Sequence, residues 1–219
     1  MRLGMGLALL LTFGGLTVAS PATDARAFAA ARLLDERVLG LALEAAACAR
    51  DSRRIALDNP GLLTVIDYSK PSTEPRLWVL DLEHGQVLFE ERVAHGRGSG
   101  ENFATSFSNE AGSQQTSLGL FRTADAYDGA NGYSLRLDGL EVGFNDRAHE
   151  RAIVMHGAPY VGEASIELLG RLGRSHGCPA LRPAIARTVI DAIKQGSLVF
   201  AYYPDARWLG GSEFLNGCS

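Results

Sequence analysis

The sequence lacks an excess of charge of either sign, and this absence excludes several classes of partner. Its 219 residues carry 21 Lys and Arg against 25 Asp and Glu, which gives a formal net charge of −4 at pH 7, and its lysines form no cluster. Proteins that bind nucleic acid or an anionic lipid surface by electrostatic attraction carry a basic patch instead. We therefore expect no nucleic-acid partner.

Proline is also scarce, with 8 residues against 25 glycines, and the glycines recur without a period. The chain has no internal repeat and no low-complexity tract. This composition favours a loop-rich β fold over a helical bundle.

A single apolar run, from Leu3 to Val18, follows one arginine and precedes small residues. This pattern is typical of a secretory signal peptide, here residues 1–20, with cleavage as late as about residue 27. The run is short and rich in glycine for a membrane span, which leaves an uncleaved anchor as the minor alternative. No cysteine follows it, so lipoprotein processing is not indicated. We expect export without a stable membrane span after cleavage.

Cysteine is rare and odd in number: Cys48, Cys178 and Cys218. No Cys-x-x-Cys pair is present, which argues against a thiol redox protein. In an oxidising compartment, three cysteines leave one thiol unpaired or paired with another molecule.

Hydrophobic periodicity predicts one long helix and then many short strands. The helix spans 24–50 and has an apolar face at steps of three and four, made of Ala27, Ala31, Leu34, Val38, Leu41, Ala45 and Cys48. Strands are expected at 62–68, 76–82, 86–93, 117–123, 133–140, 151–157 and 197–203, the second and third as a hairpin. Two short helices are expected at 163–172 and 183–194.

This order of elements predicts a mainly β (α+β) domain. The sheet would form a sandwich or barrel, with an N-terminal amphipathic helix and short peripheral helices around it. The stretch 95–115 is polar, rich in glycine and serine, and too long for a simple connection in a compact domain. It either lines a groove or forms a solvated lid.

The segment "GRSHGCPALRP", residues 173–183, carries the candidate chemistry. Cys178 lies 22 positions after His156, which ends an apolar strand. A thiol nucleophile needs a base or a cationic neighbour, so His156 is a candidate base. Gly157 and Gly177 allow close backbone approach, and the amides of Gly177 and Cys178 are candidate donors to an oxyanion.

The residues alone leave two other interpretations open. Cys178 is also acceptable as a simply buried side chain near a junction of loop and helix. Zinc is the other alternative, because His156, His176 and Cys178 are all acceptable ligands. No fourth ligand and no paired metal spacing accompany them, so we expect no metal.

The arrangement His156-Gly157, followed by Ser175-His176-Gly177-Cys178, resembles the signature of the L,D-transpeptidases, the YkuD-type peptidoglycan enzymes. The segment "TSLGLF" (116–121) resembles their Thr-Pro-x-Gly-x-Phe segment, and "AIVMHG" their histidine strand. The resemblance covers about 62–203 and is nearest to the murein L,D-transpeptidase catalytic-domain branch.

The resemblance implies a YkuD-like fold and a role for each signature residue. Cys178 would be the acylated nucleophile and His156 its base, with the Gly157 carbonyl orienting the imidazole. Ser175 and His176 would shape the pocket. The backbone amides of residues 176–178 would form the oxyanion hole.

The chain also departs from the family pattern. Pro179 and Ala180 stand where members have an apolar residue and then an arginine, and Ser117 replaces the proline of the upstream segment. If that arginine holds a substrate carboxylate, another would replace it. The tentative substrate-binding residues are Arg174, Arg182, Thr116 and Gly119.

The implied reaction is acyl transfer on peptidoglycan stem peptides, without metal or organic cofactor. Cys178 would release D-alanine from a tetrapeptide and form a thioester, which another stem resolves into a 3–3 cross-link. An envelope protein and water are alternative acceptors, and water would make the chain an L,D-carboxypeptidase. A peptidoglycan-binding module without catalysis is the alternative from another class.

The resemblance also has implications for the other cysteines and for the division of the chain into segments. If Cys178 stays reduced, Cys48 and Cys218 are free to form a disulfide. We expect a helical segment at 24–58, a catalytic domain at 59–205 and a C-terminal tail at 206–219. A signal peptide without a cell-wall anchor motif or wall-binding repeat favours a Gram-negative periplasm.

Overall fold

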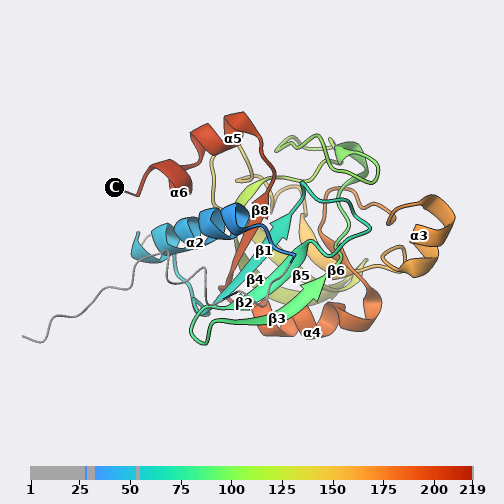
Figure 1. Cartoon of the computed structure of the whole chain (residues 1–219), viewed down its shortest axis with the longest axis horizontal. Helices are drawn as coiled ribbons and strands as arrows, with labels where there is room; N and C mark the ends of the chain where they lie inside the picture. The colour runs from blue at the N-terminus through green and yellow to red at the C-terminus, as the bar shows by residue number, and fades with distance from the viewer. Residues whose placement is uncertain (1–27, 29–32, 53–54, 219) are drawn as a thin grey trace, which may run out of the picture.

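The computed structural model describes residue 28 and residues 33–52 and 55–218 (Figure 1). The expected signal peptide lies outside these residues. In chain order the elements are α2 (Glu36–Asp51), β1 (Leu62–Asp67), β2 (Leu77–Asp81), β3 (Gln86–Glu91), the 3-10 helix η1 (Arg97–Ser99), β4 (Gly119–Gly129), β5 (Gly132–Gly139), β6 (Val154–Gly157), α3 (Glu163–Leu169), β7 (Ala180–Leu181), α4 (Pro183–Ile193), β8 (Leu198–Tyr202), α5 (Ala206–Gly211) and α6 (Glu213–Asn216).

The strands form one eight-stranded sheet in the order β3-β2-β1-β8-β4-β5-β6-β7. β1 pairs with β8, and β6 with β7, in parallel, and the other neighbouring pairs are antiparallel. Beyond β3, an antiparallel bridge joins Ala94 to Ala180 of β7. The two edges of the sheet therefore meet, and the predicted fold class, a mainly β domain with peripheral helices, is confirmed.

Helix α2 starts later than the sequence periodicity predicts. The Asp35 side chain accepts hydrogen bonds from the N–H groups of Arg37 and Val38, at 2.8 and 3.2 Å, which is the geometry of an N-cap. The prediction of helix before Asp35 is wrong for residues 33–35, and most earlier residues lie outside the described chain. The buried face of α2 contains Val38, Ala45 and Cys48 as expected.

The sheet matches the predicted strands closely, including the hairpin of β2 and β3. Four elements were not predicted: η1, β7, α5 and α6. β7 has two residues, a length at which a strand leaves no periodic pattern in a sequence. The predicted strand 151–157 begins only at Val154, because the chain turns at Ala152, whose φ is 54°.

One apolar core joins the N-terminal helix, the sheet and the C-terminal residues. Leu39 and Ala42 of α2, Leu63 of β1, and Trp208 and Phe214 near the C-terminus are all buried in it. The expected tail therefore folds back as α5 and α6. Figure 1 shows α6 beside α2 and α5 next to α6, whereas α3 projects at the far end of the molecule.

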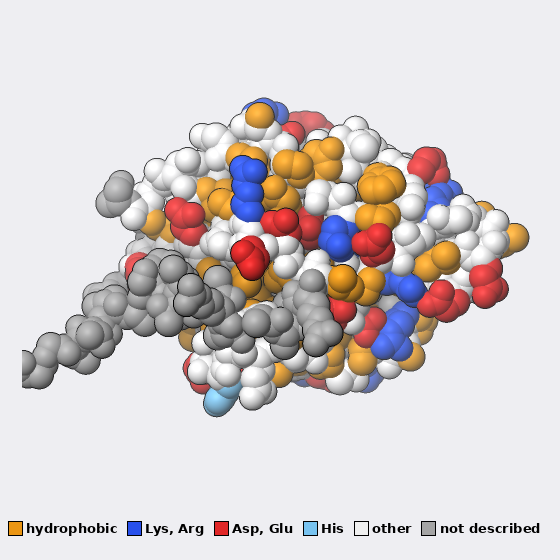
Figure 2. Space-filling model, viewed as in Figure 1, with side chains coloured by type: hydrophobic (Ala, Val, Ile, Leu, Met, Phe, Trp, Pro, Cys, Tyr) orange, Lys and Arg blue, Asp and Glu red, His pale blue; other side chains and the backbone are white. Residues whose placement is uncertain are grey.

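The molecular surface carries charges of both signs. Figure 2 shows Lys and Arg interspersed with Asp and Glu on the face that it draws, without a large patch of one sign. Within residues 28, 33–52 and 55–218, no helix has the length and apolar character needed to cross a membrane.

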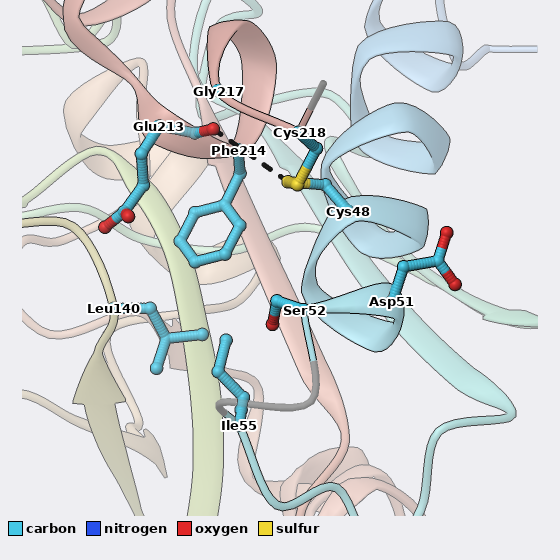
Figure 3. A pocket seen from close by; sticks show the side chains of 9 residues that line it. All are labelled: Cys48, Asp51, Ser52, Ile55, Leu140, Glu213, Phe214, Gly217 and Cys218. Carbon is cyan, nitrogen blue, oxygen red and sulfur yellow. Dashed lines mark hydrogen bonds between the residues drawn. A yellow bond between two sulfur atoms is a disulfide. The ribbon is translucent and has the colours of Figure 1, made fainter.

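The disulfide joins α2 to the C-terminal end of the chain. Cys48 is bonded to Cys218, with 5.5 Å between the two Cα atoms, and Cys178 is the free cysteine (Figure 3). Beside this disulfide lies a hollow of about 430 Å³, lined in part by Phe214, Leu140 and Ile55. The odd cysteine count is thus resolved as a bonded pair and one thiol.

We predict that the disulfide contributes strongly to stability, because its sequence separation is 170 residues. Closing so long a loop restricts the unfolded chain, so Cys48→Ser should lower the free energy of unfolding by about 2–5 kcal/mol. Denaturant titration with and without reductant measures this. Cys178→Ser is the matched control and should respond to reductant as the wild type does. Equal stability of Cys48→Ser and wild type would contradict the prediction.

Candidate active site

The pairing of β6 with β7 brings His156 and Cys178 into the same neighbourhood. The parallel register sets His156 opposite Ala180, so that Cys178, two residues earlier, lies opposite Val154. Side chains two residues apart on a strand share a face. Cys178 itself lies just before β7, where its Sγ accepts a hydrogen bond from the N–H of Val154, two residues before His156 on β6.

His156 is buried and oriented by its own backbone neighbour. Its Nδ1 lies 3.0 Å from the Gly157 carbonyl oxygen, to which it donates, and Nε2 is left as the acceptor nitrogen. Burial lowers the pKa of His156, and the hydrogen bond to Gly157 opposes this effect. The imidazole is thus neutral at neutral pH and able to accept a proton.

The Cys178 thiol is 8% exposed and lies against the chain that enters β6. The Sγ atom accepts from the Val154 N–H at 3.5 Å and donates to the Ala152 carbonyl at 3.7 Å. Burial raises the pKa of the thiol, while the Val154 N–H and the charge of Arg151 lower it. The resting groups are therefore a thiol and a neutral imidazole.

Ser175 shapes the loop that carries the nucleophile. Its hydroxyl donates to the Cys178 carbonyl at 2.6 Å and accepts from the Gly177 N–H at 3.1 Å. Gly177 has φ 127°, and a Cβ there would lie 2.9 Å from the Gln115 carbonyl oxygen. Only glycine fits this position without strain.

The loop after β3 supports the nucleophile loop from the other side. Thr116 is buried, accepts from the Gly96 N–H at 2.9 Å and donates to the Gly177 carbonyl at 3.1 Å. The Ser175 N–H donates to the His95 carbonyl at 3.0 Å. The long segment 95–115 therefore packs against the site.

A buried arginine, Arg76, is hydrogen-bonded to His95, the residue whose carbonyl accepts from the Ser175 N–H. Arg76 donates to His95 Nδ1 at 2.8 Å and to the Val93 carbonyl through Nε and Nη2, at 2.9 and 2.7 Å. Burial, reinforced by the charge of Arg76, lowers the pKa of His95 to about 4. His95 is therefore neutral and structural, although the sequence left its role open.

The remaining candidates differ in what they contact. His176 is exposed beside the nucleophile. Arg174 donates to the Gly100 carbonyl at 2.9 Å and to Glu101 at 2.8 Å. Arg182 makes two hydrogen bonds to Glu91, at 2.8 and 2.7 Å, so its guanidinium is already paired.

Thr116 and Gly119, expected to bind substrate, contact protein groups, and their role in substrate binding stays a prediction. Gly119 opens β4 with φ 110°, and a Cβ there would lie 2.5 Å from Glu141 Oε1. We interpret both residues as supports of the site.

Sequence reasoning missed Arg76, Arg151 and Ala152. Arg151 and Ala152 were assigned to a strand, and a left-handed alanine leaves no sequence signal. The one available signal for Arg151 was its position five residues before His156. Among the described residues, no group of three His, Cys, Asp or Glu side chains is arranged to hold a metal ion.

This geometry defines a class of protein: a barrel-like β domain that presents a histidine on one strand, β6, and a free cysteine in the segment just before the neighbouring strand, β7. The family model YkuD_2, described as L,D-transpeptidase catalytic domain, matches residues 30–202. The chain therefore belongs to this family and carries an L,D-transpeptidase catalytic domain. No curated protein sequence matches the chain.

Several solved structures are similar to this chain. An L,D-transpeptidase from Mycobacterium smegmatis is 17% identical with a TM-score of 0.40, over 65% of this chain and 59% of that one. L,D-transpeptidase 3 from Mycobacterium tuberculosis is 14% identical with a TM-score of 0.42, over 65% and 61%. The chain thus covers less than two thirds of the length of either protein. An L,D-transpeptidase from Stackebrandtia nassauensis is 18% identical with a TM-score of 0.39, over 76% and 68%.

We predict that Cys178 alkylation follows a pKa above that of an ordinary cysteine. The thiolate is the reactive form and burial raises the thiol pKa, so the reaction with iodoacetamide should have its midpoint above about pH 8.5. The rate as a function of pH measures this, and the urea-unfolded chain, reduced and alkylated at all cysteines, gives the reference. A folded-state midpoint below that of the unfolded chain would instead indicate a preformed ion pair with His156.

We also predict that His95 makes folding sensitive to acid. Its folded-state pKa of about 4 lies below the ordinary 6.5, so the folded protein holds His95 neutral. The stability that depends on the neutral imidazole is fully present above pH 6.5 and is lost as the pH falls towards 4. The shift corresponds to about 3 kcal/mol. Urea unfolding at several pH values should show a smaller acid loss for His95→Asn than for the wild type. Equal losses would contradict the prediction.

Proposed function

We propose that this chain transfers acyl groups between peptidoglycan stem peptides through a thioester on Cys178. The observation that carries the proposal is the pairing of β6, which holds His156, with β7, which directly follows the segment of the free thiol; Cys178 Sγ accepts from the Val154 N–H of β6. Membership of the L,D-transpeptidase catalytic-domain family supports the choice of substrate. The proposal needs no metal and no organic cofactor.

In the first half-reaction, Cys178 Sγ attacks the carbonyl carbon of the third residue of a tetrapeptide stem. His156 Nε2 takes the thiol proton as the bond between sulfur and carbon forms. The bond to the terminal D-alanine then breaks, and the proton passes from His156 to the leaving amine. A thioester and free D-alanine are the products.

Backbone N–H groups of the nucleophile loop would stabilise the negative oxygen of the tetrahedral intermediate. The Gly177 N–H is held by the Ser175 hydroxyl. The N–H groups of His176 and Cys178 donate to no other residue in the described part of the chain. We therefore assign the oxyanion hole to these two amides, which develop their full effect only when the charge appears.

In the second half-reaction an acceptor attacks the thioester and restores the Cys178 thiol. The amine of a second stem gives a 3–3 cross-link, with His156 taking the amine proton. A lysine of an envelope protein would give an anchored protein. Water would give an L,D-carboxypeptidase.

We extend the proposal to the site of action, which is the periplasm of a Gram-negative cell. Residues 1–20 would act as the signal peptide. The Cys48–Cys218 disulfide supports export, because disulfides persist in oxidising compartments.

We predict that the mature protein, incubated with purified tetrapeptide muropeptides, releases D-alanine and forms cross-linked dimers. The intact protein should gain the mass of an acyl group, and a carbapenem should form an adduct in the same way. Cys178→Ala should lose both adducts, because the thiol is the attacking group. His156→Gln should reduce turnover by at least about 100-fold through loss of the base.

The exposed His149 provides a matched control, and His149→Gln should retain activity. Products that are tripeptides alone would identify the carboxypeptidase. A folded wild-type protein with neither product nor adduct would refute the proposal and favour a peptidoglycan-binding module.

A further inference from the structure

Arg151 is a partly buried cation that is surrounded by neutral acceptors. Its Nη1 donates to the Ser108 carbonyl at 2.7 Å and to the Ser117 hydroxyl. Its Nη2 donates to the Gln115 carbonyl at 2.6 Å and to the Ser113 hydroxyl at 3.3 Å. The remaining donor, Nε, is buried without an acceptor among the described residues.

The neighbouring Arg147 has the opposite surroundings. Its guanidinium forms ion pairs with Glu110 at 3.0 Å and with Glu150 at 3.1 Å. Arg151, four residues later, forms no ion pair with any carboxylate of the described chain. Glu110 attracts Arg151 only from a distance, because its carboxylate pairs with Arg147. A positive charge withdrawn from water is costly unless a negative charge lies near it, so the missing direct counter-charge of Arg151 needs an explanation.

The turn before β6 directs Arg151 toward the nucleophile. The Ile153 N–H donates to the Ala148 carbonyl at 2.9 Å and the Ala152 N–H to the His149 carbonyl at 3.0 Å, which is the pattern of a Schellman motif. Ala152 occupies its left-handed position with φ 54°, where glycine is usual. A non-glycine residue held in this conformation is often found at functional sites.

This turn places two groups near Cys178, the Ala152 carbonyl and the Arg151 guanidinium. The Ala152 carbonyl accepts from Cys178 Sγ at 3.7 Å. On the adjacent side, a Cβ at Gly177 would lie only 3.6 Å from Arg151 Nη2, so the guanidinium lies close to the residue directly before the nucleophile. The thiol and the guanidinium are thus held by the same short stretch of backbone.

We propose that Arg151 is the electrostatic partner of Cys178, a positioning residue whose missing counter-charge is supplied by the thiolate. The proposal rests on the proposed function in one respect, namely that Cys178 is the nucleophile. When His156 removes the thiol proton, the sulfur gains a negative charge near Arg151, whose other negative neighbour, Glu110, is ion-paired to Arg147. The cation therefore favours the ionised nucleophile over the resting thiol.

The other titratable groups that face the thiol do not supply a positive charge. Burial raises the pKa of Tyr160, which precedes α3, to about 12, and raises the pKa of Tyr68, which follows β1. Both tyrosines are thus neutral at neutral pH, and His156 is neutral in the resting site. Among these groups Arg151 is the cation.

The pKa directions agree with this geometry. Burial is the largest influence on both groups: it raises the pKa of the Cys178 thiol and lowers the pKa of the Arg151 guanidinium. Their mutual attraction opposes burial in each case, because it lowers the pKa of the thiol and raises that of the guanidinium. Each group therefore stabilises the charged form of the other.

The test is the pH midpoint of iodoacetamide alkylation at Cys178 in the full-length mature protein. Arg151→Gln removes the charge, so the midpoint should rise by about half a pH unit or more. Arg151→Lys keeps the charge and loses the fork of donors, so its midpoint should stay close to wild type even where its melting temperature falls. Arg147→Gln is the matched control, because it removes a charge that is already paired, and its midpoint should be unchanged.

An unchanged midpoint in a folded Arg151→Gln protein would overturn the proposal, and so would equal shifts in Arg151→Gln and Arg151→Lys, which would indicate a purely structural role. If the glutamine variant does not fold, Arg151→Met, which fills a similar space without polar groups, replaces it under the same criteria. Alkylation requires no stem peptide. A failure of transpeptidation with the predicted midpoint shift would refute the proposed function alone.

Discussion

The antiparallel bridge between Ala94 and Ala180 closes the sheet, and the geometry of the site depends on it. The Ala94 N–H donates to the Ala180 carbonyl at 2.8 Å, which joins the chain after β3 to the strand at the opposite edge. β7 has only two residues, too few for pairing with β6 alone to hold it firmly. Because Cys178 stands two residues before β7, closure of the barrel fixes the thiol relative to His156.

Neutral groups hold this site together, and two arginines lie among them. Arg76 donates to backbone carbonyls and to His95, and Arg151 to carbonyls and hydroxyls of the segment 108–117. An arginine keeps its charge even where burial lowers its pKa, as it does for Arg76, to about 10. The surroundings of the nucleophile are therefore positive and poor in water, which favours reactions that create negative charge on sulfur or oxygen.

Sequence reasoning performed best where a local pattern exists. Short runs of β-type residues predicted β1, β2 and β3, and Pro183 marked the start of α4. The start of α2 was wrong because apolar spacing continued through residues 24–35, whereas the Asp35 cap sets the boundary. The sequence did not predict β7, because two residues are too few to show a period. It did not predict the turn at Ala152 either, because glycine is the usual signal of such a turn.

The sequence by itself predicted the candidate pair, His156 and Cys178, and determined the composition of the loop around Cys178 and the succession of short strands. These features are local: neighbouring residue types fix them through spacing, glycine content and hydrophobic period. Only the tertiary structure decided which cation lies beside the thiol, that Thr116 supports the nucleophile loop, and that Arg182 is paired with Glu91. Such contacts join segments far apart in the chain, and they exist only once the sheet has closed.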